Sequence, residues 1–184
     1  MATSNEQPSW KETVRQRRIK RQEQIPEAWR LSPAQISSSK DVRVVIHSSG
    51  ILSPKELEWT DMTDVRPLLQ KLATRQVTSL EVTTAFCKRA AIAQQVTNCL
   101  TEIFFDQALK RAQELDSQLL TNGGKPVGPL HGLPVSIKDR FDVEGLDTTV
   151  GVFPYLYQFV LNSVMVLLFP SGNQRFNAEY LFPY

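Results

Sequence analysis

The sequence lacks several features that mark specialised classes of protein. With only two cysteines, Cys87 and Cys99, in 184 residues, it has no framework of disulfides. Its formal net charge of +2 is too small to indicate a nucleic acid or an anionic membrane as a partner. No apolar segment follows the polar residues after Met1, so no secretory signal peptide is expected. We therefore expect a cytoplasmic protein, in a compartment that keeps thiols reduced.

The sequence also lacks the spacing of a metal or nucleotide site. His47 and His131 do not stand at metal-ligand distances from each other or from the cysteines, which we interpret as small core side chains. Gly123-Gly124-Lys125 lacks the upstream glycine and the following hydroxyl residue of a phosphate-binding loop, so a turn is favoured. The run His47-Ser48-Ser49-Gly50 sets a base beside hydroxyls, but adjacent side chains diverge, which favours a polar loop. We expect no metal and no cofactor.

What the sequence does contain is typical of a soluble globular protein. It is 41% hydrophobic and 22% charged, and its length fits one domain or a piece of one. Residues 1–58 are polar and unevenly basic, and we expect a helical and extended arm. A helix is predicted over Trp10–Gln24, ending before Pro26. Its basic residues are Arg15, Arg17, Arg18, Lys20 and Arg21. Without interleaved aromatic residues they indicate a solvated helix face rather than a nucleic-acid-binding one.

Residues 59–149 have the pattern of an α/β domain. Thr78 and Glu81 form a capping box. The helix that they open is expected to bury one face, formed by Val82, Phe86, Ala90 and Ala93. The other expected elements are a helix over Asp64–Thr74, a strand over Leu100–Phe105, a helix capped by Asp106 that ends at Asn122-Gly123-Gly124, and a strand over Leu133–Ile137. This order predicts helices layered on a sheet.

The composition changes abruptly near residue 150. Residues 150–184 hold all four tyrosines and five of the nine phenylalanines, and Arg175 and Glu179 are their only charges. Residues 150–169 are uncharged and approach the length that spans a bilayer. Pro154 and Asn162 weaken a transmembrane helix. We expect a divergent apolar tail that does not cross a membrane.

The stretch from Gly128 to Asp139 carries the strongest signal for chemistry. On the pair alone, Lys138-Asp139 indicates a solvated charge pair at the edge of a strand. The strand alternation, however, places Val135 and Ile137 on one face and Ser136 and Lys138 on the other. A lysine beside a serine at the end of a strand can act as a general base when burial lowers its pKa.

The same stretch resembles the lysine motif of the amidase signature family. The residues are Leu130-His131-Gly132, Pro134, Ser136 and Lys138-Asp139, followed by Gly145, Asp147 and Thr148-Thr149. Upstream segments resemble fungal acetamidase-type members: Trp10 through Trp29-Arg30-Leu31, Thr78-Ser79-Leu80-Glu81, Asn98-Cys99-Leu100-Thr101-Glu102, and Ala112 with Leu115-Asp116. The resemblance covers about residues 8–150, in several spaced elements that keep their order.

The resemblance implies a mixed sheet covered by helices, here only its N-terminal portion, and a Ser-Ser-Lys triad. Lys138 matches the lysine, which acts as base through a bridging serine to activate a nucleophilic serine against a small-molecule amide. Asp139 would lie beside it, and Ser136 matches a motif position outside the triad. His131 and Gly132 would shape the turn. Nothing in the sequence sets the oligomeric state.

The family's two serines lie downstream of the lysine in a Gly/Ser-rich stretch, and no such stretch follows Lys138 here. The resemblance ends near Gly151, where the composition also changes. We therefore expect a truncated or miscalled gene product that is inactive as written. Two alternatives remain, a non-catalytic remnant or interaction protein, and a tail-anchored protein with residues 150–169 in a membrane. The last is the weakest, because Pro154 and Asn162 interrupt the apolar run.

Overall fold

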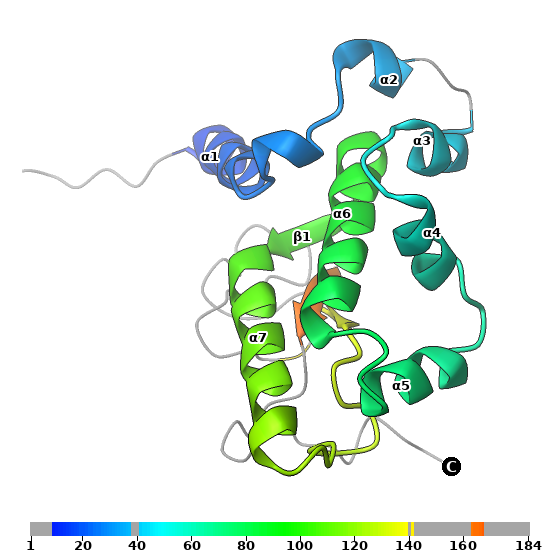
Figure 1. The fold of residues 1–184 in the computed structure, drawn as a ribbon. Coiled ribbons are helices and arrows are strands. Elements are labelled where there is room, and N and C mark those ends of the chain that lie inside the picture. The colour runs from blue at the N-terminus through cyan, green and yellow to red at the C-terminus, as the bar shows by residue number, and fades with distance from the viewer. Residues whose placement is uncertain (1–8, 38–40, 140, 142–162, 168–184) are drawn as a thin grey trace, which may run out of the picture.

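The computed structural model describes residues 9–37, 41–139, 141 and 163–167. The elements in chain order are α1 (Trp10–Glu23), the 3-10 helix η1 (Glu27–Trp29), α2 (Pro33–Ser37), α3 (Val42–Ser48), α4 (Pro54–Thr60), α5 (Arg66–Ala73), α6 (Ser79–Thr97), β1 (Leu100–Ile103), α7 (Phe105–Thr121), β2 (Val135–Lys138) and β3 (Ser163–Leu167). The described part of the chain is mostly helical. Figure 1 shows α7 beside α6, with α3 and α4 along another side of α6.

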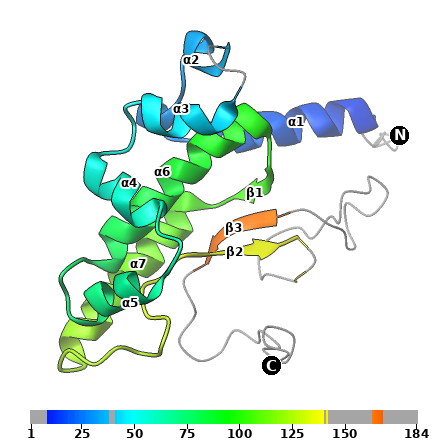
Figure 2. The same ribbon diagram turned by 90° about the vertical axis from the view of Figure 1, so that its right-hand side faces the viewer.

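The strands form a small sheet in the order β1-β3-β2. β3 pairs in parallel with β1 and antiparallel with β2, and the register sets Lys138 opposite Ser163. Figure 2 shows α6 and α7 on the same side of these strands. β2 was predicted to start two residues and to end one residue too early. β3 was not predicted, because it lies in the segment interpreted as a divergent tail. The other residues after Phe141 lie outside the described part, and so does most of that tail.

Helix α6 is the centre of the fold. Thr78 and Glu81 close the predicted capping box, and Asn98 ends the helix in the left-handed region with φ 50°. The prediction of a buried face is confirmed for Val82 and Ala90, but it was too narrow, because α6 is buried on several sides. Its buried positions include Val82, Ala85, Cys87, Ala90, Ala91 and Ile92, whereas Phe86 and Ala93 are half-buried. The reason is tertiary, since α3, α4 and α7 all pack against it.

Helix α7 begins differently from the prediction. Its N-cap is Phe104, which has no side-chain cap, and Asp106 lies inside the first turn rather than at the cap. Phe104 and Phe105 are both buried, so apolar packing sets the start of the helix where a capping carboxylate was expected. The other end follows the prediction, because Asn122 caps the helix and Gly123 takes φ 63°.

The basic face of α1 is only partly solvated, which corrects the interpretation from the sequence. Arg17 pairs with the buried Glu102 of β1 at 3.2 Å. Arg21 donates from Nη1 to the carbonyl of Leu100 at 2.9 Å. Arg15, by contrast, pairs on the surface with Glu12 of its own helix. The helix is therefore fixed against β1 by two of its arginines.

The two cysteines have different surroundings, although both were predicted to be core side chains. Cys87 is buried in a cluster with Ile25 and Phe105, and this burial raises the pKa of its thiol to about 12. Cys99 is exposed, because it follows the helix cap at Asn98 and precedes β1. Only the first cysteine is therefore a packing residue.

Candidate functional site

The turn before β2 is fixed by apolar side chains. Leu133 is buried, and Leu130 packs beside it. They belong to a cluster whose buried members are Trp59, Leu68, Leu72, Val77, Val82 and Ala85. These residues come from α4, α5, α6 and the segment between α5 and α6. The strand that ends in Lys138 therefore starts from a point held by the helical core.

Gly132 brings this turn into close contact with the start of α6. Its φ is +75°, and a Cβ at this position would lie 2.4 Å from Oγ of Ser79 and 3.1 Å from Cδ2 of Leu72. Both the backbone conformation and the lack of space require glycine. The role of Gly132 in shaping the turn for the proposed site stays a prediction.

His131 is buried, with 5% of its surface exposed. The backbone N–H of Val127 donates to Nδ1 of the ring at 3.4 Å, and the N–H of His131 donates to the carbonyl of Gly128 at 3.2 Å. Burial lowers the pKa of the imidazole. The charge of Asp116 acts to raise this pKa, and the charge of Arg111 acts to lower it further. The ring thus lies within the turn, where it joins the two ends of residues 127–131.

Asp116 of α7 was noted only as part of a resemblance, yet it holds the start of α6. Its Oδ1 accepts from the N–H of Ser79 at 2.7 Å, and its Oδ2 accepts from the N–H of Leu80 at 3.0 Å. These are two of the N–H groups that a helix leaves without intrahelical partners at its N-terminus, where a negative charge is favourable. One indication of this role is present in the sequence, which is that the acidic Asp116 directly follows Leu115, a residue predicted to face inward.

β2 presents the residues of the lysine motif as the alternation predicts. Val135 and Ile137 are half-buried, whereas Ser136 and Lys138 are exposed. Asp139 is 1% exposed, so the interpretation of Lys138-Asp139 as a solvated pair is wrong for the aspartate. The N–H of Phe141 donates to the carbonyl of Lys138 at 3.1 Å, which turns the chain directly after the strand.

A hollow of about 390 Å³ lies between α3, α6 and β2. Its lining is Ile46, Phe86, Arg89, Ala90, Ala93, Pro134, Val135 and Ser136. Of the motif, only residues before Lys138 reach it.

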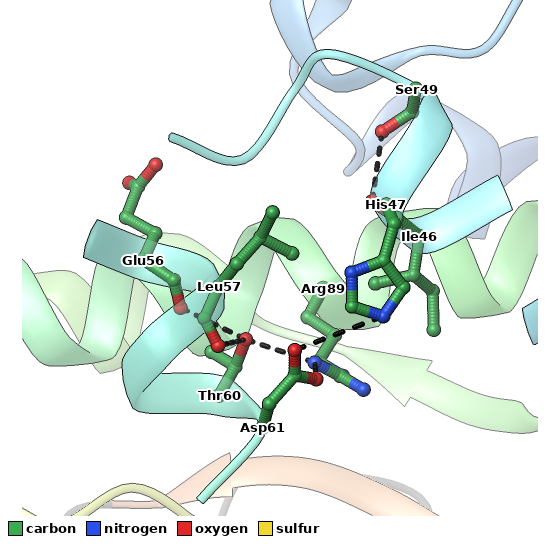
Figure 3. A network of polar contacts seen from close by, with 8 residues as sticks. All are labelled: Ile46, His47, Ser49, Glu56, Leu57, Thr60, Asp61 and Arg89. Carbon is green, nitrogen blue, oxygen red and sulfur yellow. Dashed lines mark hydrogen bonds and ion pairs between the residues drawn. The ribbon is translucent and has the colours of Figure 1, made fainter. Parts of the chain in front are cut away.

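A polar network lies at the edge of this hollow (Figure 3). Arg89 donates to Asp61 and to Thr60, and Nε2 of His47 lies 3.7 Å from Oδ2 of Asp61. The hydroxyl of Ser49 donates to the carbonyl of Ile46 and does not contact His47. His47 lies on α3 rather than in the predicted loop. The structure therefore joins α3, α4 and α6 here and forms no base–nucleophile pair.

The described residues form neither a metal site nor a membrane span. Among the described residues, no group of three or more His, Cys, Asp or Glu side chains is arranged to hold a metal ion. No helix in the described ranges is long and apolar enough to cross a membrane.

Comparison with known proteins gives consistent matches. Residues 81–158 match the family model described as Amidase. The chain is 44% identical over 151 residues to an acetamidase of Emericella nidulans, a match that covers 82% of this chain and 27% of the relative. It is 43% identical over 154 residues to an amidase of Gibberella moniliformis, covering 80% of this chain and 29% of the relative.

A solved structure titled fatty acid amide hydrolase matches with a TM-score of 0.73 at 28% identity, over 86% of this chain and 31% of that one. The described elements are thus part of an amidase-signature fold. The chain spans less than a third of the length of the curated relatives that it matches. It belongs to the amidase signature family, as a partial match to the N-terminal region of the fungal acetamidases and amidases.

Proposed function

We propose that this chain is part of a cytoplasmic amide hydrolase in which Lys138 is the general base. The observation that carries the proposal is the position of Lys138. It ends a strand whose preceding turn is anchored to α5 and α6, and it lies within the segment that matches the amidase family. The relatives named acetamidase indicate a small linear amide as the substrate class.

The proposed reaction follows the logic of an activated nucleophile. Neutral Lys138 takes a proton, through a bridging serine, from a nucleophilic serine that attacks the amide carbonyl. The proton then passes to the departing ammonia or amine, and water releases the acid from the acyl-enzyme. A lysine with this role must be neutral, which requires burial. Lys138 is exposed among the described residues, so the covering groups and both serines would come from other parts of the polypeptide.

The test uses a chimera, in which residues 8–150 of this chain replace the matching segment of the Emericella nidulans acetamidase. Release of ammonia from simple aliphatic and aromatic amides is measured. Lys138→Ala should lower kcat by about a thousandfold or more, as removal of a triad base does. Lys138→Arg should fail equally, because a guanidinium stays charged and cannot accept the proton.

The matched control is Lys110→Ala, which removes an exposed lysine from α7 and should leave turnover unchanged. Circular dichroism of each variant checks that the fold is kept. Near-normal turnover of Lys138→Ala in a folded chimera would rule out the role as base.

A further inference from the structure

The ring of His131 has a hydrogen-bonding state that the geometry dictates. A neutral imidazole carries one nitrogen that donates and one that accepts. The N–H of Val127 points to Nδ1 of His131 at 3.4 Å, which makes Nδ1 the acceptor and assigns the proton to Nε2, a buried atom with no hydrogen-bond partner among the described residues. An imidazolium has N–H groups at both positions, and its Nδ1–H would face the N–H of Val127. Protonation of the ring therefore removes this bond.

Charged groups around the ring do not reverse this preference. Burial disfavours the charged imidazolium, and Arg111 of α7 adds to that effect. Asp116 favours it, but both of its oxygens are engaged by N–H groups at the start of α6. Other charged side chains on the neighbouring elements have contacts of their own: Glu81 with Thr78 and Lys55, Lys71 with Glu58, Arg66 with Asp64, Glu114 with Arg111, and Arg75 beside Gly124.

We propose that His131 is a positioning residue for Lys138. In its Nε2–H tautomer, His131 ties Val127 to the turn and so fixes the start of β2. The turn is pinned on one side of the ring by Gly132, which abuts Ser79, and by Leu133 in the apolar cluster. On the other side, Val127 is exposed, so the bond to the ring is its link to the core. The link to Lys138 rests on the proposed function, whereas the tautomer and the turn do not.

The first test measures the tautomer in the unaltered 184-residue chain. The chain is labelled with ¹⁵N-histidine, and the ring nitrogen shifts are recorded by NMR at pH 7.5. The chain has two histidines, and the surface variant His47→Gln identifies the remaining signals as those of His131. The expected result is an unprotonated Nδ1 and a protonated Nε2. An Nδ1–H tautomer, or an imidazolium at this pH, would overturn the proposal. This test requires no substitution of His131 itself.

The second test asks whether the acceptor atom positions the turn. His131→Asn offers an amide oxygen close to the place of Nδ1, whereas His131→Phe keeps a ring of similar size without an acceptor. Amide hydrogen exchange at Val127 and the amide shift of Lys138 are the two readouts. His131→Asn should keep the protection of Val127 to within about threefold. His131→Phe should lose about tenfold or more, the loss expected for one hydrogen bond, and should shift the Lys138 signal.

Equal behaviour of the two variants would show that His131 only fills space, and the positioning role would fall. Both readouts come from this chain and need no turnover. A chimera that fails to hydrolyse amides would therefore count against the proposed function, and would leave the tautomer and the Val127 bond to be decided by these measurements.

Discussion

Gly132→Ala is the substitution for which the structure allows the most complete estimate. An added Cβ would meet Oγ of Ser79 at 2.4 Å and Cδ2 of Leu72 at 3.1 Å, from a backbone with φ +75°. The left-handed backbone costs a residue with a Cβ about 1–2 kcal/mol. The steric overlap adds about 1–3 kcal/mol. The expected loss in the free energy of unfolding is therefore about 2–5 kcal/mol, a large share of the stability of a typical domain.

The surroundings of Gly132 leave little room for relief. The hydroxyl of Ser79 can rotate away, but its backbone N–H is held by Asp116 at 2.7 Å, and its Cβ would still lie 3.1 Å from the new methyl group. The substitution Ser79→Ala removes Oγ, and with it the overlap between that atom and the Cβ added at position 132. The double variant should therefore recover part of the loss, and the part that stays reports the backbone strain together with the contact to Leu72.

The assay is urea unfolding followed by tryptophan fluorescence, recorded with Trp10 and Trp29 replaced by Phe in every variant so that the signal comes from Trp59, which is buried in the cluster that receives Leu133. Gly128→Ala is the matched control from the same turn, because a Cβ there meets nothing within 4 Å. It should change the free energy of unfolding by less than about 0.5 kcal/mol. Equal stability of the two variants would show that the turn does not approach α6 as described, and the reasoning about Lys138 would lose its support.

Four further outcomes are expected. Asp116→Ala should destabilise by about 1–3 kcal/mol in urea unfolding, because two N–H groups at the start of α6 lose their acceptor, whereas the isosteric Asn variant should lose less. Phe86→Asp should lower the melting temperature strongly, since it places an unpaired charge against the core, and Phe86→Leu should not. In the native chain a maleimide should label Cys99 and spare Cys87, whose thiol is buried with a pKa of about 12; equal labelling before unfolding would contradict the structure. Because the pKa of His131 is lowered by folding, its contribution to stability is present above the unfolded value of about 6.5 and is lost as the pH falls, so His131→Phe should flatten the acid side of a stability–pH curve.

The sequence predicted those elements whose signals are local. α1 ends before Pro26, α5 follows its leucines, and α6 opens at the capping box of Thr78. α4 was missed although Ser53 and Glu56 form the same kind of capping box, because the polar composition of residues 1–58 was given more weight than the cap. That error was avoidable from the sequence.

The rest depended on contacts between distant segments. Asp106 has the properties of a cap, but the burial of Phe104 and Phe105 moved the start of α7. The alternation along β2 predicted which of its residues are exposed, yet it gave no sign that Asp139 is buried. These effects cannot be predicted from a single sequence, because each is set by a contact with a residue far away along the chain. The site was therefore predicted as a motif and not as a set of contacts.

The position of Lys138 depends on the start of α6 as well as on the pairing of its own strand with β3. β2 has four residues and pairs along one side with β3. The turn that leads into it contacts the core through Gly132 and Leu133. Gly132 abuts Ser79, whose N–H is in turn held by Asp116 from the neighbouring helix. A displacement of the first turn of α6 relative to α7 would therefore pass through Gly132 to the strand, and Lys138 would move although it touches neither helix start. Glycine is required at this position because only a residue without a Cβ lets the turn come this close to Ser79.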